Sequence, residues 1–444
     1  MRRRLPECPR QSTMKKRRAV LAFPAGACVA SCAWAADSLP LSTNPVPSPE
    51  AAQAILEQTA RGETLRLMGL DLFPHAGARV TYDDNLFISH IGRENDVVWS
   101  LTPGLMLATG DVSQSLPGPV TLEQLRNLLY YSLADEATKP RRFLGVDYTP
   151  SINFYTEHND LNNVDQLARL SAGYNFSRLT IGLDFDFTRA QVKDNSVGNL
   201  VTIAQYDARL RTRYDFTDVT SLEVDGEYFR FNYADPRFQG YQDFRNEDWL
   251  NRQFGEKLSA GLGAAFGYLE PENSPEQTYE QALVRAVYRL TGKSYLSASA
   301  GVEVRQFRTG APDAVTPVFR VAGIYQPWVN TTFTLEAYRL QDPAPFNNLN
   351  YIELGAGAGV RQLLLNRWYA GLTAGYDNVQ YNQIQQTQAT VRTDNYWFAQ
   401  LNLDYEFNPH WTATLFYTFS SDDSDVPTFS YYNDLVGARI TWRY

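Results

Sequence analysis

The chemistry open to this chain depends first on its four histidines. A histidine beside a carboxylate is a common general base in hydrolases, and two such neighbourhoods occur, His158 with Asp160 and His90 with Glu94. No nucleophile motif accompanies either pair, and side chains in loops this polar are usually just solvated. The sequence therefore predicts that the protein is not an enzyme.

Metal and cofactor sites have equally little support. The acidic run at 421–425 could bind a divalent cation loosely, but it lacks the spacing of a calcium loop. The sequence contains neither a zinc-ligand pattern nor a glycine-rich phosphate loop. We expect no metal and no cofactor.

A group of polar residues interrupts the first strand-like segment. The stretch 79–89 reads RVTYDDNLFIS, with apolar residues at even positions around the motif Tyr82, Asp83, Asp84 and Asn85. Two explanations stay open: a β-bulge that turns the carboxylates inward, or a strand end that reaches water. If the sheet closes on itself, we expect Asp83 or Asp84 to face Arg439 or Arg443 of the last strand and to fix the closing register.

Three consecutive strand-like segments carry charges on one face, which we call the charge ladder. Its members are Asp184 and Asp186, then Arg209, Arg211 and Arg213, then Glu223, Asp225 and Glu227. Opposite charges across an antiparallel pair stabilise by roughly 0.2–1 kcal/mol each. The ladder can brace a water-filled wall, and because both signs occur it predicts no ion selectivity. The turn at Asp218 predicts the pairs Arg211–Asp225 and Arg209–Glu227, and the loop at Val197 predicts Asp184–Arg211 and Asp186–Arg209.

The elements that position these charges alternate with a period of two. In 179–188, 397–407 and 411–419 one face is apolar and aromatic and the other is polar. About 18 such segments (16–18) follow residue 75, joined alternately by tight turns and longer polar loops. This pattern predicts an all-β fold, a transmembrane up-and-down antiparallel β-barrel over 75–444 with short periplasmic helices. A soluble sandwich is the alternative, but segments this long are unusual in soluble sheets.

The N-terminus predicts export. Basic residues at 15–18, an apolar run and the Ala33-Trp34-Ala35 sequence indicate a signal peptide over 1–35, with Met14 as an alternative start. A lipobox reading of Cys32 is the other interpretation. All three cysteines lie before residue 36, so the mature chain would have no disulfide. It would carry 32 basic and 48 acidic residues, a formal charge of −16, which disfavours nucleic acid as a partner.

Two segments are predicted to be helical. Residues 36–74 form a periplasmic segment with a short helix at 48–61, and an insertion at 110–142 contains an amphipathic helix at 121–135, opened by a capping box. The second helix can rest on the barrel rim, enter the lumen or bind a periplasmic partner, and the sequence leaves these three placements open.

The chain ends in alternating residues with a terminal aromatic: Ile440, Trp442 and Tyr444. This resembles the C-terminal signal that outer-membrane proteins present to the barrel assembly machinery. The other expected partners are outer-membrane lipid and lipopolysaccharide.

The segment 65–105 resembles the opening of the β-barrel porin 2 family. The matching residues are Leu65-Arg-Leu67, Pro74, Val80 to Phe87, Asp96-Val-Val98 and Leu101 to Leu105. That family includes outer-membrane proteins encoded in exopolysaccharide biosynthesis clusters. The resemblance implies a porin-like barrel in the cell outer membrane, and also the passage of a polysaccharide with periplasmic export partners. The alternatives are a general small-solute diffusion porin and a structural or surface-interaction barrel with a closed lumen.

Overall fold

The computed structural model describes residues 65–67, 70–110, 141–255, 257–291, 294–328, 330–384 and 390–444. The predicted signal peptide 1–35 and the predicted helices at 48–61 and 121–135 lie outside these ranges, so they stay predictions.

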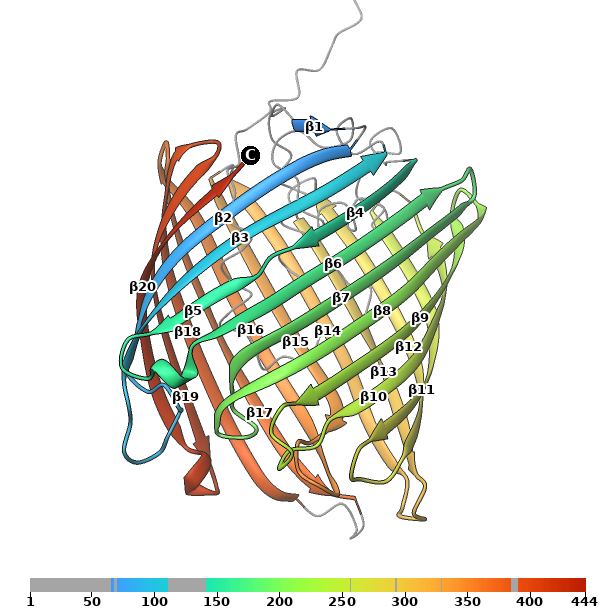
Figure 1. The fold of residues 1–444 in the computed structure, drawn as a ribbon. Helices are drawn as coiled ribbons and strands as arrows, with labels where there is room; N and C mark the ends of the chain where they lie inside the picture. Colours follow the sequence, from blue (N-terminus) through green and yellow to red (C-terminus); the bar gives the residue numbers. More distant parts are fainter. Residues whose placement is uncertain are drawn as a thin grey trace, which may run out of the picture.

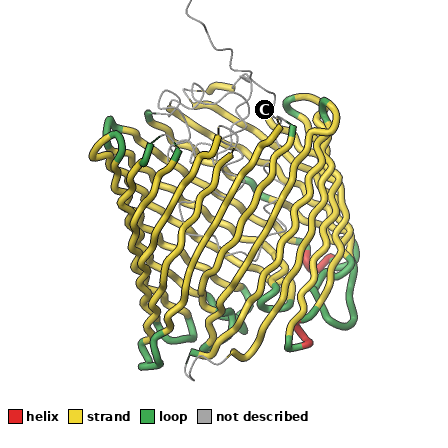
Figure 2. Tube along the Cα trace, turned by 180° about the vertical axis from the view of Figure 1, so that it is seen from behind, coloured by secondary structure: helices red, strands yellow, loops and turns green. Residues whose placement is uncertain are grey.

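The described residues form one antiparallel sheet of 20 strands. Two 3-10 turns, η2 (Asn159–Leu161) and η3 (Pro427–Phe429), lie in loops at one end of it (Figure 2). The strands are β1 (Leu65–Leu67), β2 (Leu70–Asp83), β3 (Asp96–Gly110), β4 (Arg142–Tyr148), β5 (Ser151–Tyr155), β6 (Asn163–Asn175), β7 (Leu179–Asp194), β8 (Asn199–Thr217), β9 (Thr220–Tyr233), β10 (Tyr241–Gln253), β11 (Leu258–Pro271), β12 (Gln277–Thr291), β13 (Ser294–Phe307), β14 (Ala314–Trp328), β15 (Thr331–Pro343), β16 (Leu349–Leu365), β17 (Trp368–Gln383), β18 (Thr390–Asn408), β19 (Trp411–Ser424) and β20 (Tyr431–Arg443).

The sheet closes into a barrel (Figure 1). Apart from β4 and β5, each strand pairs with its sequence neighbour, and β20 pairs back onto β2, from His75 opposite Arg443 to Asp83 opposite Leu435. Strands β4 and β5 share one position in the wall, because both lie between β3 and β6 and are separated only at Thr149-Pro150, where proline supplies no backbone donor. With β1 paired only to the start of β2, the wall has 18 strands, which confirms the predicted fold class.

The two faces of the wall differ as the period-two pattern predicts. Apolar and aromatic side chains point outward, among them Leu183, Trp397 and Leu415, each roughly half exposed. Carboxylates, amides and arginines such as Asp184, Glu303 and Arg305 are buried on the inner face. No helix in the described part of the chain has the length and apolar character to cross a bilayer. Pairing around a closed sheet satisfies backbone groups without water, and the apolar outer face suits lipid, so the barrel belongs in the outer membrane.

The two ends of the barrel are different. Tight turns such as 176–178 and 409–410 lie at the end that also holds the C-terminus, and the longer loops lie at the other end (Figure 1). Outer-membrane barrels have their short turns in the periplasm. The long loops therefore face outward and form the outer mouth.

Candidate functional site: the lumen and its outer mouth

The charge ladder lies on the inner face of β7, β8 and β9. Arg209 binds Glu227 at 2.8 Å and Asp207 at 2.6 Å, and Arg213 lies 3.7 Å from Glu223. Arg209 stands opposite Glu227 and Arg211 opposite Asp225, so the pairs counted from the turn at Asp218 are confirmed. These strands therefore share a continuous inner row of alternating charge.

The pairs predicted between β7 and β8 are wrong in register. Asp184 stands opposite Arg209, and Asp186 stands opposite Asp207. The hairpin closes on Asp194 and Asn199, so its turn lies one position earlier in the chain than predicted. The Asp194 carboxylate fixes the turn there because it accepts the backbone N–H groups of Ser196 and Val197. The side chains partly recover the prediction, since Arg211 still reaches Asp184 diagonally at 3.8 Å.

Several ion pairs in the lumen were not predicted from the sequence. Arg285 of β12 binds Glu223 at 2.5 Å, and Arg169 of β6 lies 4.0 Å from Asp186. Same-strand pairs two residues apart also recur; they are Asp207–Arg209, Arg245–Glu247, Glu303–Arg305 and Arg392–Asp394. This spacing places both charges on one face of a strand. This spacing of two residues is visible in the sequence, so these same-strand ion pairs could have been predicted from it.

The Tyr82-Asp83-Asp84-Asn85 motif lies at the outer rim. Strand β2 ends at Asp83, so the motif ends the strand and is not a bulge within it. Tyr82 points outward and is 43% exposed, whereas Asp83 and Asn85 are buried. The motif therefore ends the strand at the rim without a bulge, but Asp83 and Asn85 are buried there and do not reach water as the rim explanation predicted.

The motif contacts β20, but not through the predicted arginines. Arg439 lies opposite Arg79 and Arg443 opposite His75, in the periplasmic half of the β2–β20 pairing. In an antiparallel pair the end of β2 meets the start of β20, so the carboxylates reach Asn433 and Asp434 instead. Asn433 donates to Asp83 at 2.8 Å, and the backbone N–H of Asp434 donates to Asp84 at 2.7 Å.

The two carboxylates of the motif also have cationic partners. Lys193 of β7 lies 2.5 Å from Asp83, and Arg93 of the β2–β3 loop lies 2.8 Å from Asp84. The Lys193 ammonium also donates to the carbonyl of Asn85 at 2.9 Å and to the side chain of Asn433 at 2.6 Å. One lysine therefore ties both closing strands to β7.

His158 holds two outer loops together. Its Nε2 lies 2.7 Å from Glu94 and its Nδ1 lies 3.0 Å from Asp96, so its hydrogen-bond partners are these two carboxylates. These hydrogen bonds, first to Glu94 and then to Asp96, raise the pKa of His158 above its ordinary value. With both ring nitrogens directed at carboxylates, the imidazole has no lone pair left to accept a proton from a nucleophile. His90 contacts the carbonyl of Ser430 at 3.0 Å.

Four loops pack against one another over the outer mouth; we call them the outer cap, residues 195–198, 234–240, 344–348 and 425–430. Gln239 donates to the carbonyls of Ala344 at 2.7 Å and Phe346 at 2.8 Å. On the other side, Arg392 of β18 donates to the carbonyl of Ser196 at 2.9 Å. These contacts join strands on opposite sides of the barrel.

Aromatic rings form the centre of the outer cap. Phe346 lies 5.8 Å from Phe238 and 6.1 Å from Phe429, measured between ring centroids. The Arg392 guanidinium lies 3.6 Å from the centroid of Phe429. A continuous row of side chains therefore spans the mouth from the β9–β10 loop to β18.

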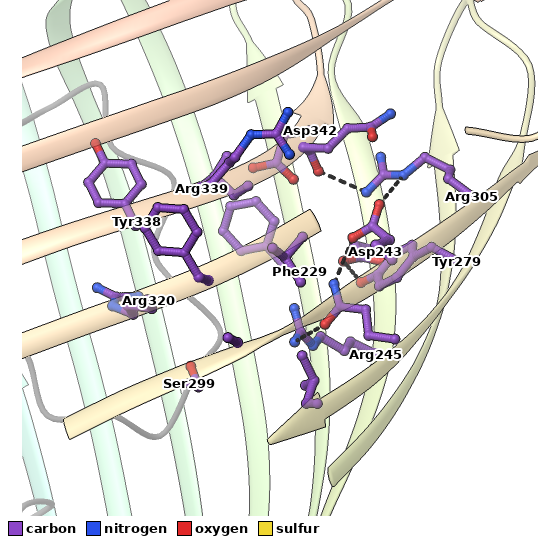
Figure 3. Close-up of a pocket in the computed structure, with 18 of the residues that line it drawn as sticks. Phe229, Asp243, Arg245, Tyr279, Ser299, Arg305, Arg320, Tyr338, Arg339 and Asp342 are labelled. Atoms are coloured by element: carbon purple, nitrogen blue, oxygen red, sulfur yellow. Dashed lines mark hydrogen bonds and ion pairs between the residues drawn. The ribbon is translucent and has the colours of Figure 1, made fainter. Parts of the chain in front are cut away.

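A pocket lies on the inner wall between β9 and β15 (Figure 3). It has about 100 Å³ of room for water-sized molecules and is lined by arginines, carboxylates and aromatic rings. Tyr279 donates to Asp243 at 2.7 Å, and Arg305 donates to Glu303 at 2.8 Å. The mixed lining offers hydrogen-bond donors and acceptors in similar measure.

The predicted C-terminal signal lies on β20 where it pairs with β2. Ile440 points outward opposite Ala78, Trp442 lies opposite Ala76, and the backbone N–H of Tyr444 donates to the carbonyl of Pro74 at 3.1 Å. Its role in assembly stays a prediction.

The chain matches no family model and no curated protein sequence. Among solved structures it is similar to the outer membrane protein OpdK of Pseudomonas aeruginosa (13% identity, 84% of this chain, 98% of that chain, TM-score 0.43). It is also similar to OccAB4 of Acinetobacter baumannii (10% identity, 84% and 98%, TM-score 0.43) and to the siderophore receptor PirA of P. aeruginosa (10% identity, 84% and 80%, TM-score 0.37).

Proposed function

We propose that the protein is a passive channel of the outer membrane and that the outer cap is its gate. The observation that carries this proposal is the row Phe238, Phe346, Phe429 and Arg392 across the mouth of an 18-strand barrel. A barrel of this size is wide enough for an aqueous lumen. The three phenylalanines of the row lie in loops, so their contacts can separate while the wall stays intact.

The lumen lining favours uncharged hydrophilic solutes. Cations and carboxylates alternate along the inner wall, so neither an anion nor a cation meets a uniform field. Tyrosine hydroxyls stand among the carboxylates, as where the Tyr338 hydroxyl lies within hydrogen-bond distance of both Glu353, at 2.8 Å, and Asp377, at 2.9 Å. Such a surface can exchange hydrogen bonds with sugar hydroxyls.

A saccharide polymer is the second candidate solute. The resemblance of residues 65–105 to the β-barrel porin 2 family supports it, and we propose that the chain is a divergent member of that family. Periplasmic export proteins would then be partners, and the barrel assembly machinery would insert the chain into lipid and lipopolysaccharide.

Planar-bilayer recording tests the gate. Phe346→Ala with Phe429→Ala should raise the open probability several-fold, because it removes the centre of the outer cap. Phe216→Ala with Phe407→Ala is the matched control, since both rings lie on the outward face near periplasmic turns and should leave conductance unchanged. Absence of conductance in the cap variant and in a variant lacking residues 111–140 would overturn the channel proposal in favour of a structural barrel.

Liposome swelling separates the solutes. Neutral oligosaccharides should enter vesicles containing the cap variant at rates that fall gradually with chain length. A cut-off at monosaccharides would exclude polymer passage and leave a small-solute diffusion porin.

A further inference from the structure

The wall between β14 and β15 is not paired along its full length. The ladder runs from Trp328 opposite Thr331 to Phe319 opposite Arg339 and stops there. Both strands continue outward, β14 to Ala314 and β15 to Pro343, each still paired on its other side. We call this unpaired outer part, residues 314–318 and 340–343, the seam.

Proline explains where the ladder stops. Extending the register by two residues would place Pro317 opposite Gln341. Proline has no backbone N–H, so it cannot donate to the Gln341 carbonyl, and Pro343 follows on the same edge of β15. Pro317 therefore removes a backbone donor next to the point at which the pairing of the two strands ends.

Side chains take over the hydrogen bonds that the backbone cannot make. Arg305 donates to the Gln341 carbonyl at 2.8 Å, Thr316 donates to the Gln341 side chain at 2.7 Å, and Arg339 donates to the Pro317 carbonyl at 2.6 Å. A side-chain contact breaks by rotamer change, whereas a backbone ladder must unfold. The seam is therefore closed by contacts that can open locally.

The seam connects the lipid-facing surface with the pocket. Pro317 stands beside the outward-facing Val302, and Arg339 beside the outward-facing Leu354, both more than 40% exposed. On the inner side, the pocket is lined by Val318 and 340–342 of the seam and by the last paired residues beside it, Phe319, Arg320 and Arg339 (Figure 3). Arg339 and the buried Arg305 both line this pocket.

We propose that the seam is a lateral portal between the outer leaflet and the lumen, and that it admits an amphiphile with an alkyl chain and a carboxylate or phosphate head. A fully polar solute would have to cross the apolar outer surface, and a fully apolar one would have to enter a charged pocket. The anionic head of the amphiphile can pass from Arg339 to Arg305 while its alkyl chain lies between β14 and β15. This route goes beyond axial passage through the proposed gate and does not depend on it.

Photolabelling in proteoliposomes tests the portal. The probe is a diazirine-bearing dodecanoate, compared with the corresponding neutral alcohol, in a variant whose cysteines at 8, 28 and 32 are replaced by serine. We expect the carboxylate to label 314–320 and 338–343 several-fold more strongly than the alcohol does.

Two variants close the seam by different means. An oxidised disulfide between Thr316→Cys and Gln341→Cys should reduce this labelling at least five-fold, with recovery on reduction. Pro317→Ala restores the missing donor and should reduce it without a crosslink. The controls are the crosslinked pair Val321→Cys and Ala337→Cys in the laddered part, and Pro271→Ala, which keeps its partner Tyr241.

Equal labelling before and after oxidation, or label absent from the seam, would overturn the portal. Because Phe346→Ala with Phe429→Ala acts on the cap alone, its labelling should match that of the wild type. The portal and the gate can therefore fail independently.

Discussion

At the scale of single residues, the carboxylate of Asp83 occupies an exceptional position. It lies where the first and last strands meet, is buried, and contacts both Lys193 and Asn433. A buried ion pair that loses one partner leaves the other charge uncompensated. Asp83 thus connects the ion pair with Lys193 at the outer rim to the pairing of β2 with β20.

Asp83→Asn with Asp84→Asn should impair assembly. The change leaves Lys193 and Arg93 without their carboxylates, at a cost on the order of 3 kcal/mol for the buried pair. The folded fraction is measured as the heat-modifiable band on gels, and it should fall several-fold. Asp160→Asn, in an exposed loop, should behave as wild type, and equal folding of both variants would contradict a role in closure.

His158 predicts a pH-dependent contact between two outer loops. Its pKa is raised, so the charged imidazolium bridge to Glu94 and Asp96 is fully present below the ordinary histidine pKa and is lost as pH rises through the raised value. A spin label at Ile91→Cys, on the 84% exposed tip of the β2–β3 loop, should gain mobility over that range. His158→Asn should flatten the profile, and an unchanged profile would rule the bridge out.

At the scale of elements, β8 shows how a strand carries charge inside a barrel. Arg209 has one acid two residues along its own strand and another across the ladder on β9, so its guanidinium is held from two directions. Arg213, nearer the periplasmic turn and more exposed, makes a looser version of the same arrangement. The brace is therefore strongest in the middle of the wall.

Arg209→Met should destabilise the barrel by about 3 kcal/mol, because Asp207 and Glu227 stay buried without a cation. Arg209→Met with Asp207→Asn and Glu227→Gln should recover most of that loss. Urea titration in lipid vesicles measures both, with Arg213→Met as a control expected to cost less than about 1 kcal/mol. A triple variant no more stable than the single one would refute the explanation.

The elements themselves were largely predictable from the sequence. Alternation places Leu183 outward and Asp184 inward because the side-chain period of a strand is two, and no tertiary knowledge is needed. Register is harder to predict, because it depends on where a hairpin turns. The Asp194 carboxylate moved the β7–β8 turn by one position, and this shift is why the Asp186–Arg209 pair failed.

At the scale of the whole molecule, the inner wall combines many local pairs of opposite charge. Arg285 reaches from β12 to Glu223 on β9, so these neutralising contacts extend beyond adjacent strands. A solute in the lumen meets alternating fields at short range that cancel at longer range.

An opened barrel should therefore discriminate poorly between ions. With the cap variant in a potassium chloride gradient, we expect a reversal potential that is a small fraction of the ideal value for either ion. Arg209→Met, which removes one cation, should shift it toward cation preference. A wild-type lumen strongly selective for one ion would contradict the balanced-charge account.

The outer cap and the seam could not have been predicted in the same way. Gln239 and Phe346 are far apart in sequence, and no local pattern marks their contact. Pro317 is visible in the sequence, but its effect depends on Gln341 standing opposite, which requires the register. The candidate site was therefore predictable as a charged wall and not as a gate or a portal.

The pairing of β2 with β20 constrains how the chain can fold. The backbone N–H of Tyr444 donates to the carbonyl of Pro74, so the contact that closes the ring joins the two ends of the described part of the chain. Contacts of such high order form late, since the entropy of the intervening chain must be lost first. Until then the molecule is an open sheet with two bare edges, each a template for pairing with another chain. The chain is therefore most exposed to aggregation in the interval before β2 and β20 pair.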